Sequence, residues 1–446
     1  MNTRKRKLKS YRVLLAGAIL FATVSAAEAG DRTASSCSAA DIQSAINQCL
    51  SSGGGTVTLP ACDFSNSWKS ADQIYADVGS TELRIIGQGT SSTKIGYADD
   101  QGQGSMWVLV GSGLKEFANI YLEGNPTIGA NAVWNAFIVR SATDCRIHHI
   151  ETRNFRGPTA MICSSRNLVI DHCTFGDVLY DTTYHFYVYD TANMPWVDAW
   201  PAEFGTANYN IFFEDNIFGG AWHTVALFER AKVVFRYNTV IIPPSTYGPS
   251  GSYQGNLDSH SPGFGSCDGD GISDEESYQH GGQAYEIYRN RFVRTDVSPP
   301  NSDGYGMRLR SGAAIVTNNT FQNVAYPVAL ALETHNLGGN CTQANGYPQD
   351  HQFGPGKAAC TASDGCCDKV QYIYVWGNTS TNFLREIQIE DESPGGGLVQ
   401  NKDYYLRSPS SAQDGFSWVP YRYPHPLVSN VGAPKPPTDV SVEKVP

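Results

Sequence analysis

Hydrophobic and polar residues alternate along many short segments of the chain, and five of these segments place an asparagine at the same point. They are IFFEDNIF, VVFRYNTV, YEIYRNRF, IVTNNTF and IYVWGNTS, in which the shared residues are Asn216, Asn238, Asn290, Asn319 and Asn378. The positions three and five residues before each asparagine carry apolar or aromatic side chains. Alternation of this kind predicts a β-strand with one buried face.

The spacing of these asparagines predicts a stack of similar structural units. It is 22 residues from Asn216 to Asn238 and 29 from Asn290 to Asn319, whereas the longer gaps fit one unit plus an insertion. A period in the twenties is typical of a solenoid, and short β-rich segments without an L-x-x-L-x-L frame favour a parallel β-helix. We expect the asparagine at a tight turn, where it tolerates left-handed backbone and its amide can bond to the next coil.

The segment LVIDHCTF fits the same frame, with Cys173 at the asparagine position. Asp171 and His172 therefore fall on a strand of the stack, and we interpret them as structural rather than catalytic. Each asparagine segment is preceded by a second alternating segment, for example YGMRLRSG before AAIVTNNTF. Nearly the whole chain then forms one all-β domain, a single parallel β-helix with two long loop insertions at residues 241–282 and 336–369.

The beginning of the chain predicts an export signal followed by a cap. Residues 1–12 carry six cations, the apolar run VLLAGAILFATVSA follows, and Ala-Glu-Ala ends at residue 29, which is the pattern of a secretory signal peptide. The next segment predicts an amphipathic helix with Ile42, Ile46 and Leu50 on one face, which would cover the open end of a solenoid. The expected divisions are a signal peptide at 1–29, a β-helix domain at 30–430 and a Pro-rich tail at 431–446.

Charge and cysteine content narrow the location and partners. Loss of residues 1–29 removes six cations and one Glu, which takes the formal charge from −11 to −16. A net negative surface argues against nucleic acid and anionic membranes as partners, and no later segment is apolar enough to span a membrane. We expect a secreted monomer.

Eleven cysteines remain after cleavage, and in an exported protein they favour disulfides over a zinc site. Their odd number leaves at least one unpaired or paired between chains. Two groups of cysteines are candidates for disulfide bonds, and their pairing stays open: Cys37, Cys49 and Cys62, and Cys341, Cys360, Cys366 and Cys367.

Several segments resemble the pectate-lyase-like parallel β-helix proteins that bacteria secrete. A helix followed by GGGTVTLPA and LRIIGQGTSSTKI is similar to the opening of that superfamily, and VIDHCTF resembles one of its coils. FRYNTV, DSHSPG, GGQAYEIYRNRF and the terminal WVPYRYPHPL add to the resemblance, which covers roughly residues 35 to 428. It implies a right-handed parallel β-helix and leaves the reaction open, because this fold carries lyases, hydrolases, epimerases and binding proteins.

Charged residues gather on one face of the strands that precede the asparagine segments. In NLDSH, MRLRS and ALALETH, strand periodicity places the charged groups opposite Leu and Met. Strands of consecutive coils lie about 4.8 Å apart, so these groups form one outer surface. The candidate catalytic residues are Asp258, His260, Arg308, Arg310, Glu333 and His335. The coils before it add candidate substrate contacts at Arg230, His185, Tyr187 and Tyr189, and the coil after it adds Gln388 and Glu390.

The two arginines, Arg308 and Arg310, repel each other on this surface. Guanidiniums two residues apart on a strand lie roughly 7 Å apart and repel by about 2 kcal/mol at an effective dielectric near 20. Acidic neighbours on the flanking coils can offset this repulsion, and so can an acidic ligand. A solvated, salt-bridged face is the plainer interpretation, and it contributes little energy.

The first insertion holds a candidate calcium loop, SCDGDGISDEE. Asp268, Asp270 and Asp274, with Gly271 for the sharp turn, match part of the D-x-D-x-D-G pattern. Ser266 stands where the first Asp would be, and no Glu occupies the twelfth position. A calcium site and a plain acidic turn both remain open.

The charged face favours a polysaccharide lyase acting on uronic-acid polymers, so the expected partner is an acidic polysaccharide or another glycan. β-Elimination needs a cation beside the uronate carboxylate and a base beside carbon 5. The candidates are Arg308, Arg310 or calcium as the cation, His260 or His335 as the base, and Tyr187 or Tyr189 as the acid.

Other functions fit the same residues. Pectate lyases carry an R-x-P-R-x-R-like segment, whereas this chain has YGMRLR, with Tyr305 at the first Arg and Met307 at the Pro. A glycoside hydrolase would use Asp258 and Glu333, roughly 10 Å apart across two coils. An epimerase would use nearly the constellation of the lyase, and a non-enzymatic protein would bind glycan or build a surface with the same face.

Overall fold

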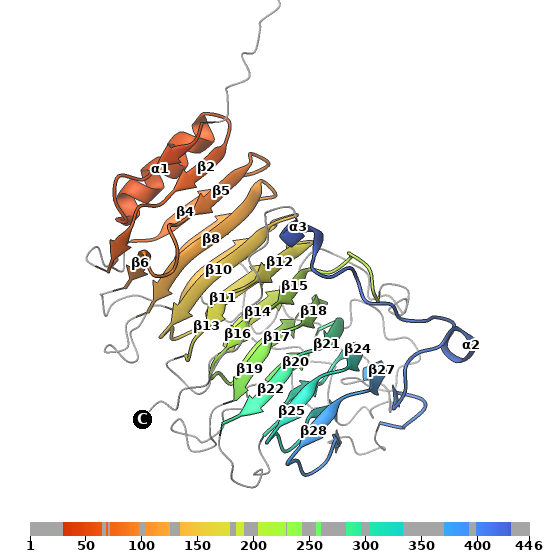
Figure 1. Ribbon diagram of the computed structural model, residues 1–446. Helices are drawn as coiled ribbons and strands as arrows, with labels where there is room; N and C mark the ends of the chain where they lie inside the picture. Colours follow the sequence, from red (N-terminus) through yellow and green to blue (C-terminus); the bar gives the residue numbers. More distant parts are fainter. Residues whose placement is uncertain are drawn as a thin grey trace, which may run out of the picture.

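Parallel strands stacked along one axis make up most of the structure (Figure 1). It is a computed structural model, and it describes residues 30–64, 68–69, 72–97, 104–124, 134–178, 184–190, 204–228, 230–242, 256–259, 282–295, 304–332, 370–391 and 398–429. Each strand pairs in parallel with the strand of the next coil, as β12 (Leu168–Asp171) does with β15 (Ile211–Glu214). The all-β fold expected from the sequence, a single right-handed parallel β-helix, is confirmed.

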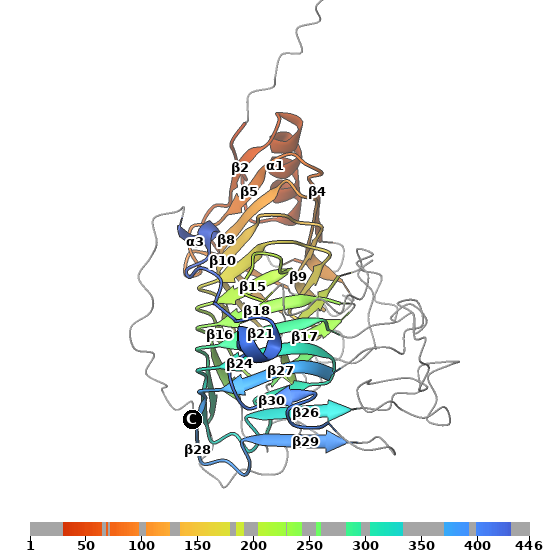
Figure 2. The same cartoon turned by 90° about the vertical axis from the view of Figure 1, so that its right-hand side faces the viewer.

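The coils contribute their strands to three ladders. The first ladder runs through β4 (Ile74–Asp77), β7 (Ser105–Val110), β9 (Asn135–Arg140), β11 (Ala160–Cys163), β14 (Tyr184–Tyr189), β17 (His223–Phe228), β20 (Asn256–Ser259), β23 (Met307–Leu309), β26 (Val328–Leu332) and β29 (Ile387–Asp391). Figure 2 shows the stack from the side, with β29 at the end of the molecule opposite the first helix.

The other two ladders share strands β8 (Leu114–Glu123) and β10 (Arg146–Arg153), which run through the bend between them. The second ladder also contains β1 (Arg32–Thr33), β2 (Gly55–Thr58), β5 (Leu83–Ile86), β12, β15, β18 (Lys232–Arg236), β21 (Ala284–Tyr288), β24 (Gly312–Thr317), β27 (Val370–Trp376) and β30 (Tyr404–Tyr405). The third contains β3 (Cys62–Asp63), β6 (Thr93–Gly96), β13 (Thr174–Phe175), β16 (Ile217–Phe218), β19 (Thr239–Ile242), β22 (Arg291–Arg294), β25 (Thr320–Gln322) and β28 (Thr379–Thr381).

Alternation along the strands fills the interior with apolar side chains. In β18, Val233 and Phe235 belong to the core, whereas Val234 lies in a separate cluster on the outer face. Aromatic rings at equivalent positions of successive coils stack: the ring centroids of Phe175 and Phe218 lie 5.1 Å apart. Each large apolar side chain buried in this way stabilises the fold by about 1.5–3 kcal/mol.

The asparagines form one buried column along the axis. Asn238 donates its backbone and side-chain N–H groups to Oδ1 of Asn290, at 2.9 and 3.2 Å, and its own Oδ1 accepts from Asn216 at 3.0 Å. Its amide also donates to the carbonyl of Phe213 at 3.0 Å. The same pattern continues through Asn319 and Asn378, which confirms that the amides bond from coil to coil.

The expectation of left-handed backbone at the asparagines themselves is wrong by one position. The residue before each asparagine has the positive φ; the values include 55° at Asp215, 59° at Tyr237 and 58° at Arg289. That residue makes the bend between the second and third ladders. The asparagine that follows must instead point inward, because its amide satisfies buried backbone groups of the neighbouring coils.

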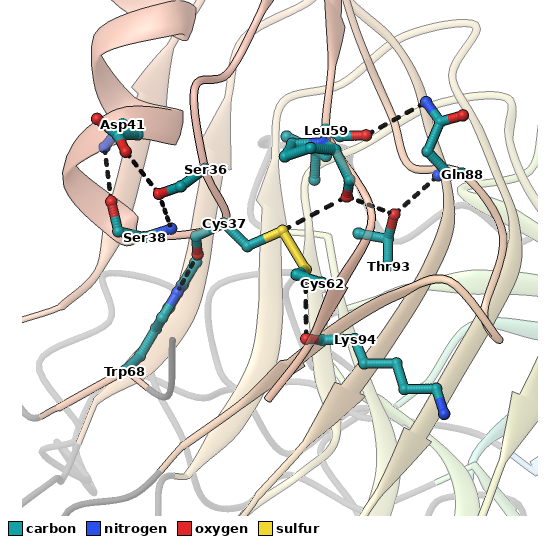
Figure 3. The surroundings of a disulfide bond; sticks show 11 residues. Ser36, Cys37, Ser38, Asp41, Leu59, Cys62, Trp68, Gln88, Thr93 and Lys94 are labelled. Atoms are coloured by element: carbon teal, nitrogen blue, oxygen red, sulfur yellow. Dashed lines mark hydrogen bonds between the residues drawn. A yellow bond between two sulfur atoms is a disulfide. The ribbon is translucent and has the colours of Figure 1, made fainter. Parts of the chain in front are cut away.

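The helix α1 (Ala39–Ser51) covers the first coil, as predicted, and a disulfide holds its entry (Figure 3). Ser38 caps it by accepting from the Asp41 amide, and Ile42 and Ile46 are fully buried. Cys37 and Cys62 are joined across 25 residues, and Trp68 donates its indole N–H to the Cys37 carbonyl at 2.9 Å.

Disulfide bonding, which we predicted, is therefore present, although only part of the cysteine set lies in the described residues. Cys49, Cys145 and Cys173 are buried free thiols, so Cys49 does not form one of the predicted disulfides. Cys163 is also disulfide-bonded. The remaining cysteines lie outside the described residues, as do the predicted signal peptide and the Pro-rich tail: Cys267, Cys341, Cys360, Cys366 and Cys367.

The end of the described chain, residues 406–429, forms a strap over the outer face of the second ladder (Figure 1). It includes the helices α2 (Ser411–Asp414) and α3 (Pro426–Ser429). Trp418 donates to Glu286 at 2.8 Å, and the buried Arg236 donates to the carbonyls of Tyr421 and Arg422 at 2.6 and 2.8 Å. Because the strap satisfies the polar groups of this face, the face is closed to ligands where the strap lies.

Replacement of Asn238 by Ala tests the asparagine column. The change leaves buried N–H and C=O groups of two coils without partners, each of which costs about 1–3 kcal/mol. We expect a loss of at least about 2 kcal/mol in the free energy of unfolding, measured by urea denaturation. Asn208→Ala, which removes an exposed amide, is the control; equal stability of the two variants would contradict a structural role for the column.

Candidate functional site

The outer face of the first ladder changes from apolar to charged along the stack. Backbone pairing aligns Tyr187 with Ala226, Ala226 with Asp258 and Asp258 with Arg308. Arg308 then pairs with Ala329, and Ala329 pairs with Gln388. The earlier coils carry an apolar cluster on this face: Val108, Ile138, Met161, Cys163, Tyr189, Ala226 and Phe228.

Asp258 and Arg310 form a closed ion pair on this face. Nε of Arg310 donates to Oδ1 of Asp258 at 2.8 Å, and a terminal nitrogen of Arg310 pairs with Oδ2. The side chains are 5% and 0% exposed, and the amide of Arg310 donates to Ser259 Oγ at 2.8 Å. A two-point, buried pair of this kind is strong and specific, so neither charge is available to a ligand.

Arg308 occupies a different environment, although it stands only two residues from Arg310. Its Nε and a terminal nitrogen both bond to one oxygen of Glu390, Oε2, at 2.8 Å. The two side chains are 20% and 17% exposed. Glu390 also accepts a hydrogen bond from the hydroxyl of Tyr305, and burial followed by this bond raises the pKa of that phenol.

Two aromatic groups flank the charged residues. Tyr305 stacks on Tyr326 of the next coil, with ring centroids 5.4 Å apart. On the other side, Tyr184 packs on Tyr187 at 4.6 Å and on His223 at 4.7 Å. Partly exposed tyrosine rings beside charged hydrogen-bonding groups are typical of surfaces that bind large polar ligands.

His223 was missed by the sequence reasoning. Strict alternation places it with Val225 and Leu227 in the core, yet its Nε2 lies 3.7 Å from Oδ2 of Asp258. The strand register shifts between His223 and Val225, which turns His223 toward the outer face. No signal in the sequence marks this irregularity.

His185, in β14, points the opposite way from the prediction. Its ring packs beside the core residues Phe175 and Phe218, at 6.2 and 5.8 Å, and its Nε2 bonds to the Gly219 carbonyl at 3.2 Å. Burial lowers its pKa to about 4. The predicted outward position of His185 is therefore wrong, and the side chain cannot contact a substrate.

The other predicted substrate contacts also differ in accessibility. Tyr187 lies on the outer face and is partly exposed, whereas Tyr189 is on the same face but fully buried among Cys163 and Phe228. Arg230 lies in the turn after β17, with a φ of 65°, rather than on a strand. Of the four contacts predicted on the earlier coils, Tyr187 is the one that lies on the outer face and is partly exposed, and of those predicted on the coil after, Glu390 bonds to Arg308.

Half of the predicted catalytic set and the whole predicted metal loop lie outside the described residues: His260, Glu333, His335, Asp268, Asp270 and Asp274. Within the described ranges, no three His, Cys, Asp or Glu side chains gather closely enough to hold a metal ion. The calcium site stays a prediction. Among the same residues, no helix is long and apolar enough to cross a bilayer.

Asp171 and His172 behave as the structural residues that the sequence predicted. Asp171 is fully buried and accepts from Nε and a terminal nitrogen of Arg146 at 2.8 and 2.7 Å. His172 Nδ1 lies 2.7 Å from Asp171, which is the largest cause of a raised pKa at His172. Both belong to the second ladder, away from the charged face of the first.

Comparison with known proteins finds no matching family model and no matching curated protein sequence. Solved structures do match. One is a protein of Geobacillus virus E2 (11% identity, TM-score 0.45), which aligns over 79% of this chain and 56% of its own length.

Two bacterial enzymes align over most of both chains. They are an alginate lyase from Paenibacillus (13% identity, TM-score 0.43, 80% of this chain and 99% of its own) and a PL6 family polysaccharide lyase from Pseudopedobacter saltans (12%, 0.39, 88% and 89%). At these identities and scores the likeness concerns the fold and does not select a reaction.

Arg308, in β23, and Arg310, just after this strand, should differ in how much their replacement by Ala destabilises the protein. Arg310→Ala removes the guanidinium that holds both oxygens of the buried Asp258, so we expect a loss of about 3–5 kcal/mol in unfolding free energy. Arg308→Ala breaks a partly exposed pair and should cost at most about 1 kcal/mol. Chemical denaturation of both variants measures the difference. Similar losses would show that the Asp258–Arg310 pair is not the structural one.

Proposed function

We propose that this chain is an exported carbohydrate-active protein that binds an acidic polysaccharide across the outer face of the first ladder. The observation that carries the proposal is the position of Arg308, a partly exposed guanidinium near the stacked Tyr305 and Tyr326. Asp258 neutralises the buried Arg310, whereas Arg308 is accessible enough to meet a ligand carboxylate. The export-type N-terminus and the Cys37–Cys62 disulfide support an extracellular setting.

β-Elimination is the reaction that this arrangement supports best. A base removes the proton from carbon 5 of a uronate, the electron pair forms the bond between carbons 4 and 5, and the bond from carbon 4 to the glycosidic oxygen breaks. An acid then protonates the departing oxygen. Arg308 would stabilise the negative charge that grows on the carboxylate in the enolate-like intermediate.

The proton-transfer groups are assigned less completely. His260 and His335 remain our candidates for the base, and the hydroxyls of Tyr187 and Tyr305 are the described candidates for the acid. A phenol with a raised pKa holds its proton at neutral pH and can deliver it to a leaving oxygen. Calcium, if the Asp268 loop binds it, would share the role of Arg308 toward the carboxylate.

One alternative loses support and another gains it. A hydrolase built on Asp258 and Glu333 is disfavoured, because the carboxylate of Asp258 is fully buried and held at both oxygens by Arg310. Glycan binding without cleavage is favoured by the burial of Tyr189, which removes one of the two acids first assigned.

Activity on polyuronates tests the proposal. We expect the protein to release unsaturated sugar ends, seen as new ultraviolet absorbance, from polygalacturonate or alginate. Arg308→Ala should lower the rate at least about a hundredfold, since one lost electrostatic stabiliser of the intermediate costs roughly 10²–10³ in rate. Arg291→Ala is the matched control, because Arg291 is an exposed arginine on the third ladder.

The possible results separate the alternatives. New reducing ends without absorbance would indicate hydrolysis and contradict the lyase. Binding without either signal, weakened by Arg308→Ala and not by Arg291→Ala, would favour the glycan-binding function. Neither cleavage nor binding on any acidic or neutral glycan would overturn the proposal.

A further inference from the structure

Arg308 and Tyr305 point their hydrogen-bond donors at one carboxylate, that of Glu390. The Arg308 bonds measure 2.8 Å, and the Tyr305 hydroxyl bonds to the same side chain. A guanidinium and a phenol converging on a carboxylate are the groups that would recognise a uronate. Glu390 therefore stands where the carboxylate of a bound sugar would lie.

The strand between these residues carries only small side chains toward this contact. Arg308 belongs to β23 and Glu390 to β29, and β26 runs between them. The residues of β26 in register with them, Ala329 and Ala331, carry only methyl groups and are fully buried. Short side chains here let Arg308 and Glu390 meet across two strand spacings, and they would let a ligand carboxylate reach Arg308 as well.

The hold on Glu390 is weak compared with that on Asp258. Arg308 uses both nitrogens on one oxygen, whereas Arg310 engages both oxygens of Asp258 as a fork. The Glu390 pair is partly exposed, and the Asp258 pair is buried. Exposed ion pairs contribute little to stability, and two-point pairs are the strong ones. A sugar carboxylate can therefore compete with Glu390 for Arg308.

Glu390 also lies on a strand with few restraints. β29 is the last strand of the first ladder and pairs on one side only, with β26. Its inward residues Ile387 and Ile389 are only partly buried, whereas their register partners Val328 and Leu330 are fully buried. Among the described residues no further coil packs on this strand, and a strand at the end of a stack can shift its side chains at low cost.

We infer that Arg308 and Tyr305 form a carboxylate subsite for a uronic-acid residue, and that Glu390 occupies this subsite as a resident competitor in the unliganded protein. The inference rests on the proposed function and specifies it. It assigns the carboxylate, rather than a hydroxyl, as the group bound at this point of the face. It also makes Glu390 an inhibitory contact and not a positioning residue for Arg308.

Binding of polygalacturonate and of alginate by Glu390→Gln tests the inference. Loss of the competitor should tighten binding about two- to fivefold, the range expected for removing an exposed ion pair. Glu386→Gln is the matched control, because it removes the same charge from an exposed side chain four residues earlier. Isothermal titration measures the dissociation constant (Kd) for each protein, with neutral galactan as a second control ligand.

Two further variants separate the roles. Tyr305→Phe should weaken binding several-fold by removing one donor to the carboxylate, while Tyr372→Phe, which removes a hydroxyl from the outer face of the second ladder, should leave it unchanged. Binding by Glu390→Gln that is weaker than, or equal to, that of Glu386→Gln would overturn the competitor role, even if Arg308→Ala abolishes binding. If the unaltered protein binds neither polyuronate, the proposed function fails and the subsite fails with it.

Discussion

Parallel hydrogen bonding between successive coils is the constraint on which the rest of this structure depends. A coil cannot bury its inward side chains alone, so each one is stable only against the coil before and after it. The pairing must also keep one register, since a slip of one residue would turn every inward side chain outward. The column of Asn216, Asn238, Asn290 and Asn319 fixes this register, because each amide must meet the next one.

The same constraint decides how charges are arranged outside. Side chains in register lie a strand spacing apart, so a charge on one coil always faces the residues of its neighbours. On the first and second ladders, side chains of opposite charge lie in neighbouring coils, as Arg146 does with Asp171 and Arg310 with Asp258. Buried pairs in which the arginine contacts both carboxylate oxygens stabilise the fold. A partly exposed, single-oxygen pair such as Arg308 with Glu390 leaves a charge that a ligand can use.

The sequence predicted the features that follow from strict periodicity. Alternation located the inward residues of strands such as β18, and the asparagine spacing identified both the solenoid and its hydrogen-bonded column. The charged face was placed on the right ladder, with Asp258, Arg308 and Arg310 on neighbouring strands. These predictions succeeded because each depends only on which residues share a face.

The sequence-based predictions failed where the backbone departs from periodicity, and where the role of a side chain depends on how deeply it is buried. His223 turned outward at the register shift before Val225, and His185 of the preceding strand turned inward. Alternation carries no trace of either change. The left-handed residue was misplaced by one, because Asn is a common left-handed residue while here Asp215 and Tyr237 take that role. Alternation also assigns a face without a depth, so it could not separate the closed Arg310 from the accessible Arg308.

Depth along the stack supports the proposed binding site at this end of the molecule. In the early coils the outer face of the first ladder is an apolar cluster that includes Ile138 and Met161, both nearly inaccessible. Toward β29 the stack runs out of coils, burial falls, and polar side chains on the same face become reachable. A polymer needs an extended surface with a fixed repeat, which the strand spacing supplies. It also needs a charge that solvent can reach, and Arg308 is partly exposed on this surface.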